Sequence, residues 1–398
     1  MPADLLSLED ALACILERSK PLSSEVVPLD RAFGRVVAEP PLARADLPPF
    51  PSSAMDGFAV RGAETPGTLP VSLRVAAGSP PTGPLESGSA AAIATGAAVP
   101  EGADTIVPVE QAVEENSQVR IAEPARANAH IRPRGGDVRE GALVVAAGVR
   151  IGPAQIGALS AAGVPEIRCF RRPRVSVLAT GDELRAPGEM LEPGQIFESN
   201  RLTIAAVLAA SGAEIDLLPV VRDEEAAQRA ALERGLAADV LVSSGGVSMG
   251  PHDLVRRVAG ALGVIEVFWG VAVKPGKPLS FGVRDDVLVF GLPGNPVSSL
   301  VASLVFVRPA LLALQGLAEP APRFQSGRTQ ITLRRSAQRD EFVRARRTAD
   351  DEGILLQPVT GQESHMIVRA ASADALVHVP RGEGEIAAGD AVRYLDLA

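Results

Sequence analysis

The chain has 398 residues, a formal net charge of −9 and 46% hydrophobic residues, which predicts a globular protein of two to four domains. The negative charge argues against a nucleic-acid partner, because such surfaces neutralise phosphates with Lys and Arg. No apolar run reaches the ~20 residues that span a bilayer, and the N-terminus lacks a signal peptide's features. Cys14 and Cys169 stand apart from any zinc or redox spacing. We therefore expect a cytoplasmic protein with no membrane partner.

The first 170 residues predict one helix followed by proline-punctuated, strand-rich sequence. Ser7-Leu8-Glu9-Asp10 resembles a capping box that opens an amphipathic helix over 4–19. Short apolar runs separated by Gly and Pro predict strands at 71–77, 105–109, 119–122 and 143–147. Residues 153–163 predict a short helix that ends at a C′ glycine.

From residue 174 strands and helices alternate, which predicts a largely parallel sheet covered on both faces. The expected strands are 175–179, 215–221, 240–242, 264–273 and 287–290. The expected helices are 201–211 with Asn200 as its cap, one capped by Asp223 that ends at Gly235, one near 254–259, and an apolar one starting at Asn295-Pro296. Past Pro320, strand-like runs at 329–333, 342–344, 354–356, 376–379 and 392–395 predict a small all-β domain.

Glycine-bearing loops follow three of these strands. They are Thr180-Gly181-Asp182-Glu183, Ser243-Ser244-Gly245-Gly246 and Gly291-Leu292-Pro293-Gly294-Asn295-Pro296. Open α/β sheets bind ligands at the carboxyl edge, where glycine loops and helix N-termini present N–H groups to anions. Taken alone, the first loop is more typical of a structural turn, and the other two are equally typical of a turn and of an anion site. Asp253, which follows Met249-Gly250-Pro251-His252, is either a helix cap or a site carboxylate.

Charged residues add further candidates. Lys274-Pro275-Gly276-Lys277-Pro278 places two ammonium groups on a stiffened loop, which suits phosphate or an oxyanion, although surface lysines are the alternative. The adjacent acids at 182–183 suit a hard cation, or form an exposed turn. The segments 51–59, 95–96 and 132–137 are each typical of turns. Neither a Gly-x-Ser-x-Gly elbow nor a paired-His signature is present, so a serine hydrolase or zinc enzyme is unsupported.

Five motifs in one sequence order carry a family resemblance. They are Ser-Ala-Met-Asp-Gly (53–57), Thr-Gly-Asp-Glu-Leu (180–184), Ser-Gly-Gly-Val-Ser (244–248), Lys-Pro-Gly-Lys-Pro (274–278) and Gly-Leu-Pro-Gly-Asn-Pro (291–296). Together they resemble the MoeA/gephyrin E-domain family of molybdopterin molybdenumtransferases over nearly the whole chain. The resemblance implies a central parallel-sheet α/β domain of MogA type at 172–317, an inserted β-rich domain at 45–138, a discontinuous elongated domain from 1–44 and 139–171, and a C-terminal β-barrel-like domain at 318–398. It also implies an elongated homodimer with its active cleft between subunits.

The same resemblance implies the site residues. The catalytic positions are Asp56, Asp137, Glu183, Asp223, Asp253, Lys274 and Lys277, with Glu183 and Asp253 near metal or molybdate. The substrate-binding positions are Thr95, Arg132, Ser243, Ser244, Gly245, Gly246, Ser248, Pro293, Gly294, Asn295, Pro296, Arg344 and Ser364. Three positions depart from the family pattern, because Phe58 stands where Tyr is usual, and Glu363 and Ala345 stand where Gly is usual.

The implied reaction inserts molybdate into the dithiolene of adenylyl-molybdopterin and releases AMP, with Mg²⁺ or a similar divalent cation. Both substrates are anions that need Lys, Arg and N–H groups, and carboxylates would hold the cation. The implied partners are a MogA-like adenylyltransferase and molybdoenzyme maturation proteins. Two alternatives stay open: an adenylyltransferase that uses ATP and unmodified molybdopterin, and a non-catalytic scaffold.

Overall fold

The computed structural model of the protein describes residues 5–246 and 254–397. The chain divides into two compact units. Unit 1 comprises Met1–Glu25, Gly34–Val36 and Phe170–Ala398, and unit 2 comprises Val26–Phe33 and Val37–Cys169. The finer division into four domains stays a prediction.

A six-stranded sheet forms the centre of unit 1, in the spatial order β14-β11-β15-β19-β18-β16. Its strands are β11 (Arg174–Ala179), β14 (Glu214–Leu217), β15 (Val240–Ser244), β16 (Ile265–Trp269), β18 (Ser280–Arg284) and β19 (Val287–Leu292). The first four in spatial order are parallel, as the alternation predicted, whereas β18 is antiparallel to both neighbours. The register pairs Ala179 with Ser244 and Ser244 with Leu292, so the loops after β11, β15 and β19 start at one edge.

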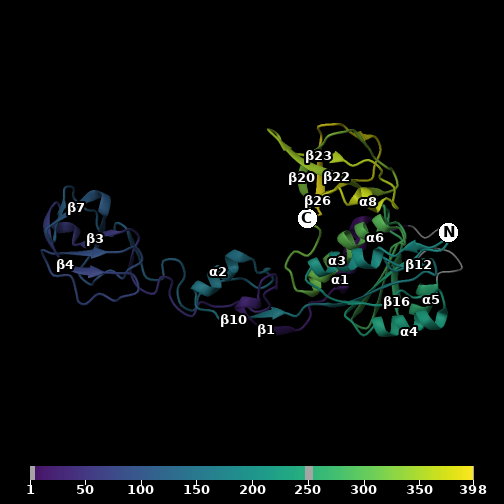
Figure 1. Cartoon of the computed structure of the whole chain (residues 1–398), viewed down its shortest axis with the longest axis horizontal. Coiled ribbons are helices and arrows are strands. Elements are labelled where there is room, and N and C mark those ends of the chain that lie inside the picture. The colour runs from purple at the N-terminus through teal and green to yellow at the C-terminus, as the bar shows by residue number, and fades with distance from the viewer. Residues whose placement is uncertain (1–4, 247–253, 398) are drawn as a thin grey trace. The chain divides into compact units, whose positions relative to one another are not determined.

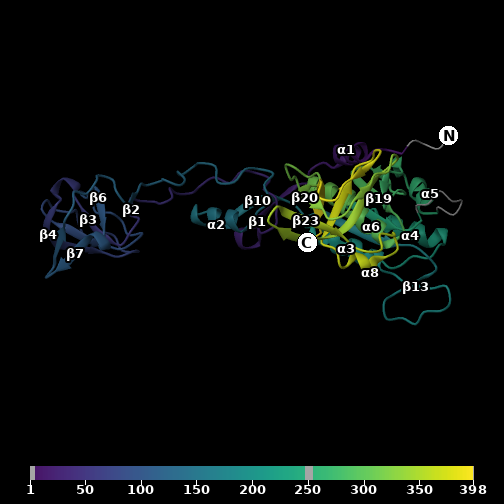
Figure 2. The ribbon, with the colours of Figure 1, turned by 90° about the horizontal axis from the view of Figure 1, so that it is seen from above.

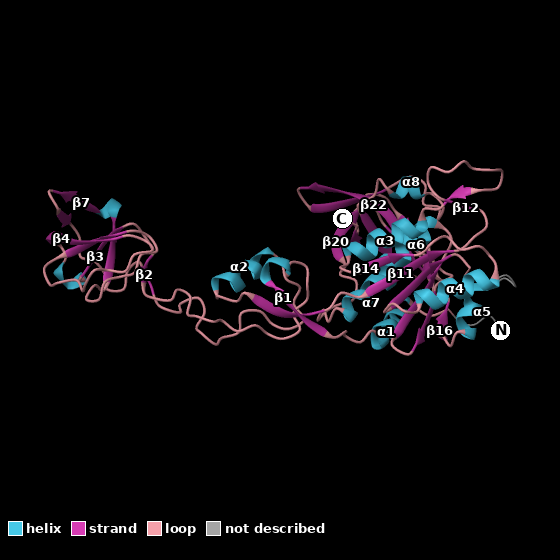
Figure 3. Ribbon diagram, turned by 60° about the horizontal axis from the view of Figure 1, so that its bottom comes forward, coloured by secondary structure: helices cyan, strands magenta, loops and turns pink. Residues whose placement is uncertain are grey.

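Helices cover both faces of this sheet (Figure 3). One face carries α1 (Leu8–Arg18), α3 (Asn200–Ala210) and a continuous helical segment made of α6 (Pro296–Ala302), the π-helical η4 (Ser303–Val307) and α7 (Arg308–Leu314). The other face carries α4 (Glu225–Gly235) and α5 (Leu254–Ala261). Successive strand side chains point to opposite faces. Val242 accordingly packs in the hydrophobic cluster on the face covered by α1, α3 and α6, and Leu241 packs in the cluster on the face covered by α4 and α5.

The helical segment Pro296–Leu314 is long and apolar enough, by length and composition, to cross a membrane. However, 83% of its most apolar window is buried inside the fold. Val301, Val305 and Phe306 are fully buried against the central sheet. Packing in the core therefore accounts for its apolar composition.

Two predicted helix caps are wrong. The N-cap of α3 is Ser199, and Asn200 is already helical, with its side chain bonded to other loops. The N-cap of α4 is Glu224, whereas the Asp223 carboxylate accepts a hydrogen bond from Gln228 Nε2 at 3.1 Å. The cap at Ser7 is confirmed, because its Oγ accepts from the N–H of Asp10 at 3.0 Å.

The C-terminal region closes into a five-stranded barrel, which confirms the predicted all-β domain. Its strands are β20 (Gln325–Thr329), β22 (Asp340–Asp350), β23 (Gly353–Pro358), β24 (Ala375–Val379) and β26 (Ala391–Asp396). They follow the order β22-β23-β20-β26-β24, and β24 pairs back with β22. The short elements of unit 1 are β12 (Leu184–Arg185) paired with β13 (Ile196–Phe197), β17 (Val273–Lys274) paired with β22, β21 (Leu333–Arg334) paired with β25 (Glu385–Ile386), and α8 (Ile367–Ala370).

Unit 2 contains another six-stranded sheet, in the order β6-β3-β5-β4-β8-β7. Its strands are β3 (Gly57–Val60), β4 (Gly67–Val75), β5 (Ala90–Ile93), β6 (Thr105–Pro108), β7 (Ala112–Glu115) and β8 (Gln118–Ile121). Strands β3, β4, β6 and β7 are labelled in Figure 2. Phe58 belongs to one buried cluster and Ala59 to another, so this sheet is covered on both faces.

The remaining elements lie outside these sheets. They are the pair β2 (Ser52–Ser53) and β9 (Ile131–Arg132), the pair β1 (Ser24–Pro28) and β10 (Glu166–Phe170), α2 (Pro153–Ala161), and the 3-10 turns η1 (Leu29–Arg31), η2 (Gly62–Glu64) and η3 (Val109–Gln111). The helix predicted at 153–163 is confirmed, and Gly163 follows it with φ +76°. The strand predicted at 143–147 is wrong, because Leu143 forms only an isolated bridge with Leu42.

Replacing Phe290 by Ala should destabilise unit 1 strongly. Phe290 lies in β19, is fully buried, and its ring centroid is 4.9 Å from that of Phe281. The cavity left by the ring should lower the free energy of unfolding by about 3–5 kcal/mol, measured by guanidinium titration with circular dichroism. The control Leu202→Ala removes a side chain that is 46% exposed and should cost less than ~1 kcal/mol. Equal losses in the two variants would contradict this account of the core.

Candidate functional site

A pocket of about 290 Å³, here called the strand-end pocket, lies at the carboxyl ends of β11, β15 and β19. It is lined by the loops after these strands, the first residues of α3 and α6, and one barrel loop. These residues are Ala179, Thr180, Glu183, Leu184, Ile196, Phe197, Glu198, Ser199, Asn200, Ser244, Gly245, Gly294, Asn295, Pro296 and His365. Six predicted site residues therefore meet where open α/β sheets bind ligands. Their individual roles stay predictions.

The loop after β15 requires its glycines. Gly245 and Gly246 have φ of +90° and +66°, a region that side chains disfavour. A Cβ on Gly245 would lie 2.9 Å from the Thr180 carbonyl oxygen, and one on Gly294 would lie 3.9 Å from the Gly245 Cα. The Gly245 N–H donates to the Leu292 carbonyl at 3.2 Å. That N–H thus ties the loop to β19 rather than facing a ligand.

The side chains of the two serines that end β15 point to opposite faces of the sheet. Ser244 Oγ accepts from Asn200 Nδ2 at 2.9 Å and lies 3.4 Å from Ser299 Oγ. Ser243 Oγ donates to the Phe290 carbonyl at 3.4 Å. Both side chains are almost fully buried and satisfied within the fold. Their contact with substrate stays a prediction. Their hydrogen bonds hold the end of β15 to the neighbouring segments.

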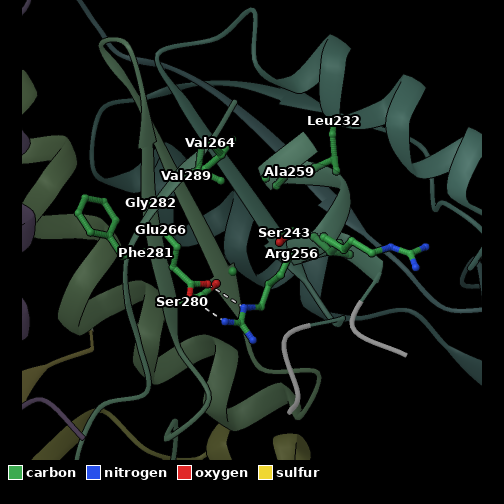
Figure 4. Close-up of a pocket in the computed structure, with 14 residues that line it drawn as sticks. Leu232, Ser243, Arg256, Ala259, Val264, Glu266, Ser280, Phe281, Gly282 and Val289 are labelled. Carbon is green, nitrogen blue, oxygen red and sulfur yellow. Dashed lines mark hydrogen bonds and ion pairs between the residues drawn. The ribbon is translucent and has the colours of Figure 1, made fainter. Parts of the chain in front are cut away.

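Ser243 borders a second pocket, of about 390 Å³, between α5 and the strands β15, β16, β18 and β19 (Figure 4). Arg256 forms two hydrogen bonds with Glu266 there, at 2.8 and 2.7 Å. Its guanidinium also lies 5.6 Å from the centroid of the Trp269 ring. The charge of Arg256 is therefore balanced inside this pocket. The sequence did not predict this pocket, because Arg256 and Glu266 are ten residues apart and belong to none of its motifs.

Carboxylates gather beside the strand-end pocket. An isolated bridge between Thr180 and Val221 brings the segment before Asp223 to the end of β11, and the Asp223 N–H donates to Asp182 Oδ1 at 3.3 Å. Partial burial raises the pKa of Asp223 above its ordinary value, and the charges of Asp182 and Glu183 raise it further. Asp182 belongs to the acidic pair at 182–183 that the sequence marked as suited to a hard cation, although the family resemblance did not place it among the site residues.

Ser248 and Asp253, two further predicted site residues, lie outside the described residues. Within residues 5–246 and 254–397, no three Asp, Glu, His or Cys side chains form a ready metal site. A cation bound near Glu183 would thus need ligands beyond the described protein groups.

Of the two predicted lysines, Lys274 ends β17 and Lys277 lies on the loop between β17 and β18. Lys274 Nζ is 3.3 Å from both carboxylate oxygens of Glu341, which the register of β17 with β22 places opposite it. Lys274 is 54% exposed, and Lys277 is also exposed. Neither lysine is among the described residues that line the strand-end pocket.

Arg344 shapes a barrel loop rather than facing solvent. Arg344 is 1% exposed, and its guanidinium donates to the carbonyls of Gly361, Glu363 and Met366 at 2.9, 3.2 and 3.0 Å. This loop carries Ser364, whose carbonyl accepts from the N–H of Val297 in α6 at 3.0 Å. Arg344 therefore holds the loop that supplies His365 to the strand-end pocket. The unusual Ala345 is fully buried in the barrel core.

In unit 2 the structure brings Asp56 and Thr95 into contact. The N–H and Oγ1 of Thr95 donate to Asp56 Oδ1 at 2.6 and 2.9 Å, and these two bonds lower the pKa of Asp56. Asp56 lines an open hollow of about 400 Å³. Arg132 lies opposite Ser52 in the β2–β9 pair, and the exposed Asp137 donates its N–H to the Leu47 carbonyl at 2.9 Å.

Comparison with known proteins covers nearly the whole chain. Three family models match: "MoeA N-terminal region (domain I and II)" at 6–163, "Probable molybdopterin binding domain" at 176–313 and "MoeA C-terminal region (domain IV)" at 317–397. A molybdopterin molybdenumtransferase of Haemophilus influenzae is 34% identical over 98% of each sequence. One of Nostoc sp. is 34% identical over 94% of this chain and 89% of that protein. Two crystal structures of molybdopterin biosynthesis MoeA protein from Pyrococcus horikoshii match 99% of this chain and 100% of theirs, with TM-scores of 0.81 and 0.85 at 31% and 25% identity.

Asp182→Asn should lower the pKa of Asp223, as measured by carboxyl NMR titration. The Asn side chain still accepts the Asp223 N–H, so only a negative charge is lost. A carboxyl whose pKa is raised by folding destabilises the protein once pH rises above its unfolded value, so the variant should also be more stable at neutral pH. The control Asp216→Asn removes a charge that does not act on Asp223. An unchanged pKa in Asp182→Asn would refute this electrostatic coupling.

Thr95→Val should raise the pKa of Asp56, because the hydroxyl donor is lost while the backbone N–H remains. Because folding lowers the pKa of Asp56, its ionised carboxylate stabilises the fold at pH values above the ordinary pKa of an Asp side chain. This contribution disappears as pH falls through the folded pKa. NMR titration of the Asp56 carboxyl tests the shift. Thr68→Val, at an exposed position of β4, should leave that titration unchanged.

Proposed function

The chain belongs to the MoeA family of molybdopterin molybdenumtransferases, and we propose that it inserts molybdate into adenylyl-molybdopterin and releases AMP. Its place in molybdenum-cofactor biosynthesis, as a transferase, rests on the near full-length match to curated relatives. The finer reaction is supported by the strand-end pocket, where three loops of the α/β domain meet. Convergence of these loops at one sheet edge is the observation that carries the proposal.

The chemistry of the pocket suits an extended anionic substrate with a polar ring. Glycine loops let a phosphate approach the backbone, and Asn295 and Pro296 begin α6, whose N-terminus favours negative charge. Phe197 and Ile196 add apolar surface on the opposite wall. Lys274 and Lys277 are exposed cations of the same domain that would neutralise molybdate or phosphate oxygens.

The acids near the pocket fit a hard divalent cation such as Mg²⁺. This ion usually takes one or two protein carboxylates and completes its shell with water and substrate phosphates, so a preformed cage is not needed. Glu183 would hold it, and the Asp182 and Glu183 charges, which add to the effect of burial in raising the pKa of Asp223, supply further negative charge beside it. When bound, the cation would neutralise charge on the phosphoanhydride.

The protein's own residues would act by positioning and charge neutralisation. The glycine loops orient the pterin phosphate and adenylate, and the lysines hold oxyanions. In unit 2, Asp56 is held ionised by Thr95. By the same family resemblance, we infer a cytoplasmic homodimer that exchanges cofactor intermediates with a MogA-like adenylyltransferase and with molybdoenzyme maturation proteins.

AMP release by the purified full-length chain tests the reaction. With adenylyl-molybdopterin and Mg²⁺, chromatography should detect AMP whose formation depends on added molybdate. Glu183→Gln removes one carboxylate charge beside the pocket and should slow AMP release about 100-fold. The control Glu233→Gln, on the exposed side of α4, should retain wild-type rates.

The alternatives predict different results in the same assay. Consumption of ATP with unmodified molybdopterin, without molybdate, would identify an adenylyltransferase instead. A folded chain that neither releases AMP nor responds to Glu183→Gln would favour a scaffold.

A further inference from the structure

The side chain of Asn200 connects two loops at the edge of the central sheet. Its Nδ2 donates to Ser244 Oγ, at the end of β15, at 2.9 Å. The same nitrogen donates to the carbonyl of Gly294, in the loop after β19, at 2.7 Å. Asn200 is the first residue of α3, which lies beside α6 (Figures 1 and 3). One amide group therefore bridges the two glycine loops of the strand-end pocket.

A buried hydroxyl network continues this bridge beneath the pocket. Ser244 Oγ lies 3.4 Å from Ser299 Oγ and 3.4 Å from the Pro293 carbonyl oxygen, and Ser299 also donates to that carbonyl. Ser244 and Ser299 are 2% and 0% exposed. Because these two hydroxyls are buried, a hydrogen bond lost from this network is not readily replaced by one to water. The spacing between the loops is thus set by protein hydrogen bonds.

The amide of Asn200 supplies the donor that both acceptors use. The Gly294 carbonyl accepts hydrogen bonds and cannot donate one, so it needs a donor, which the NH₂ group of Asn200 provides. A carboxylate at this position would place an oxygen against the carbonyl oxygen and repel it. The loops also come close together, since a Cβ on Gly294 would lie 3.9 Å from Gly245 Cα. A small change in the bridge would therefore alter the floor of the pocket.

We propose that Asn200 is a positioning residue that holds the Gly245 and Gly294 loops at the spacing needed to bind adenylyl-molybdopterin across both. Asn200 does this through Ser244 and the Gly294 carbonyl, not through the reacting atoms. The inference deepens and rests on the proposed function, because it requires one substrate to contact both loops.

Two variants and one matched control test this role in the full-length protein. Asn200→Ala removes both donors, and Asn200→Asp keeps the size of the side chain but turns the donor into an acceptor. The control Thr203→Val removes a hydroxyl of the same helix that bonds only to the Ser199 carbonyl, at 2.9 Å. Hydrogen exchange should quicken at residues 291–295 in both Asn200 variants and stay at the wild-type rate in the control.

Substrate binding is measured on the same proteins. Titration calorimetry with adenylyl-molybdopterin should show a Kd raised about tenfold or more in the Asn200 variants and unchanged in Thr203→Val. In steady-state assays the KM for adenylyl-molybdopterin should rise by a similar factor, while kcat and the KM for molybdate change less than about twofold. Asn200→Ala combined with Ser244→Ala should weaken binding less than the product of the single effects, because both act on one network.

The outcomes separate this inference from the proposed function. Wild-type affinity in the Asn200 variants, or unchanged exchange at residues 291–295, would overturn the positioning role while leaving the proposed reaction intact. A wild-type protein that binds no adenylyl-molybdopterin would overturn both. Faster exchange together with weakened binding, absent from Thr203→Val, would establish the role.

Discussion

The parallel register of β11, β15 and β19 is the constraint on which the rest of the site depends. Because Ala179, Ser244 and Leu292 lie side by side, the three loops that follow them are forced to one edge of the sheet. The strands keep this register because their alternate side chains fill two separate cores, Val242 on one face and Leu241 on the other. If one strand slipped by one residue against its neighbour, its side chains would move to the opposite faces, and its loop would no longer begin beside the other two. The strand register that packs the two cores therefore also brings the site loops together.

Hydrogen bonds inside the fold occupy several groups that the motifs marked as ligand contacts. Ser244 bonds to Asn200, Arg344 bonds to three carbonyls of one loop, and Thr95 holds Asp56. For the buried Ser244 and Arg344, the physical reason is that a polar group removed from water must find a partner or destabilise the protein. Motif residues can thus shape a site by holding its loops as well as by touching a substrate.

The carboxyl groups of Asp56 and Asp223 lie in different electrostatic environments. Asp56 has two donors from Thr95, which lower its pKa and keep it ionised. Asp223 instead has Asp182 and Glu183 as neighbours, which together with partial burial raise its pKa. The first environment satisfies its carboxylate with hydrogen-bond donors, whereas burial and two negatively charged neighbours disfavour the ionised form of the second.

The sequence by itself determined the family, the alternation of strands and helices, the all-β C-terminal region and the edge of the sheet that carries the pocket. These follow from local patterns such as β-branched runs, glycine turns and motif order, which neighbouring residues specify. Only the tertiary structure decided that Asn200 bridges two loops instead of capping α3, that Glu341 pairs with Lys274, and that Arg256 and Glu266 share a pocket. Those contacts join residues 10 to 94 positions apart. Their partners depend on how the elements pack, which no local pattern records.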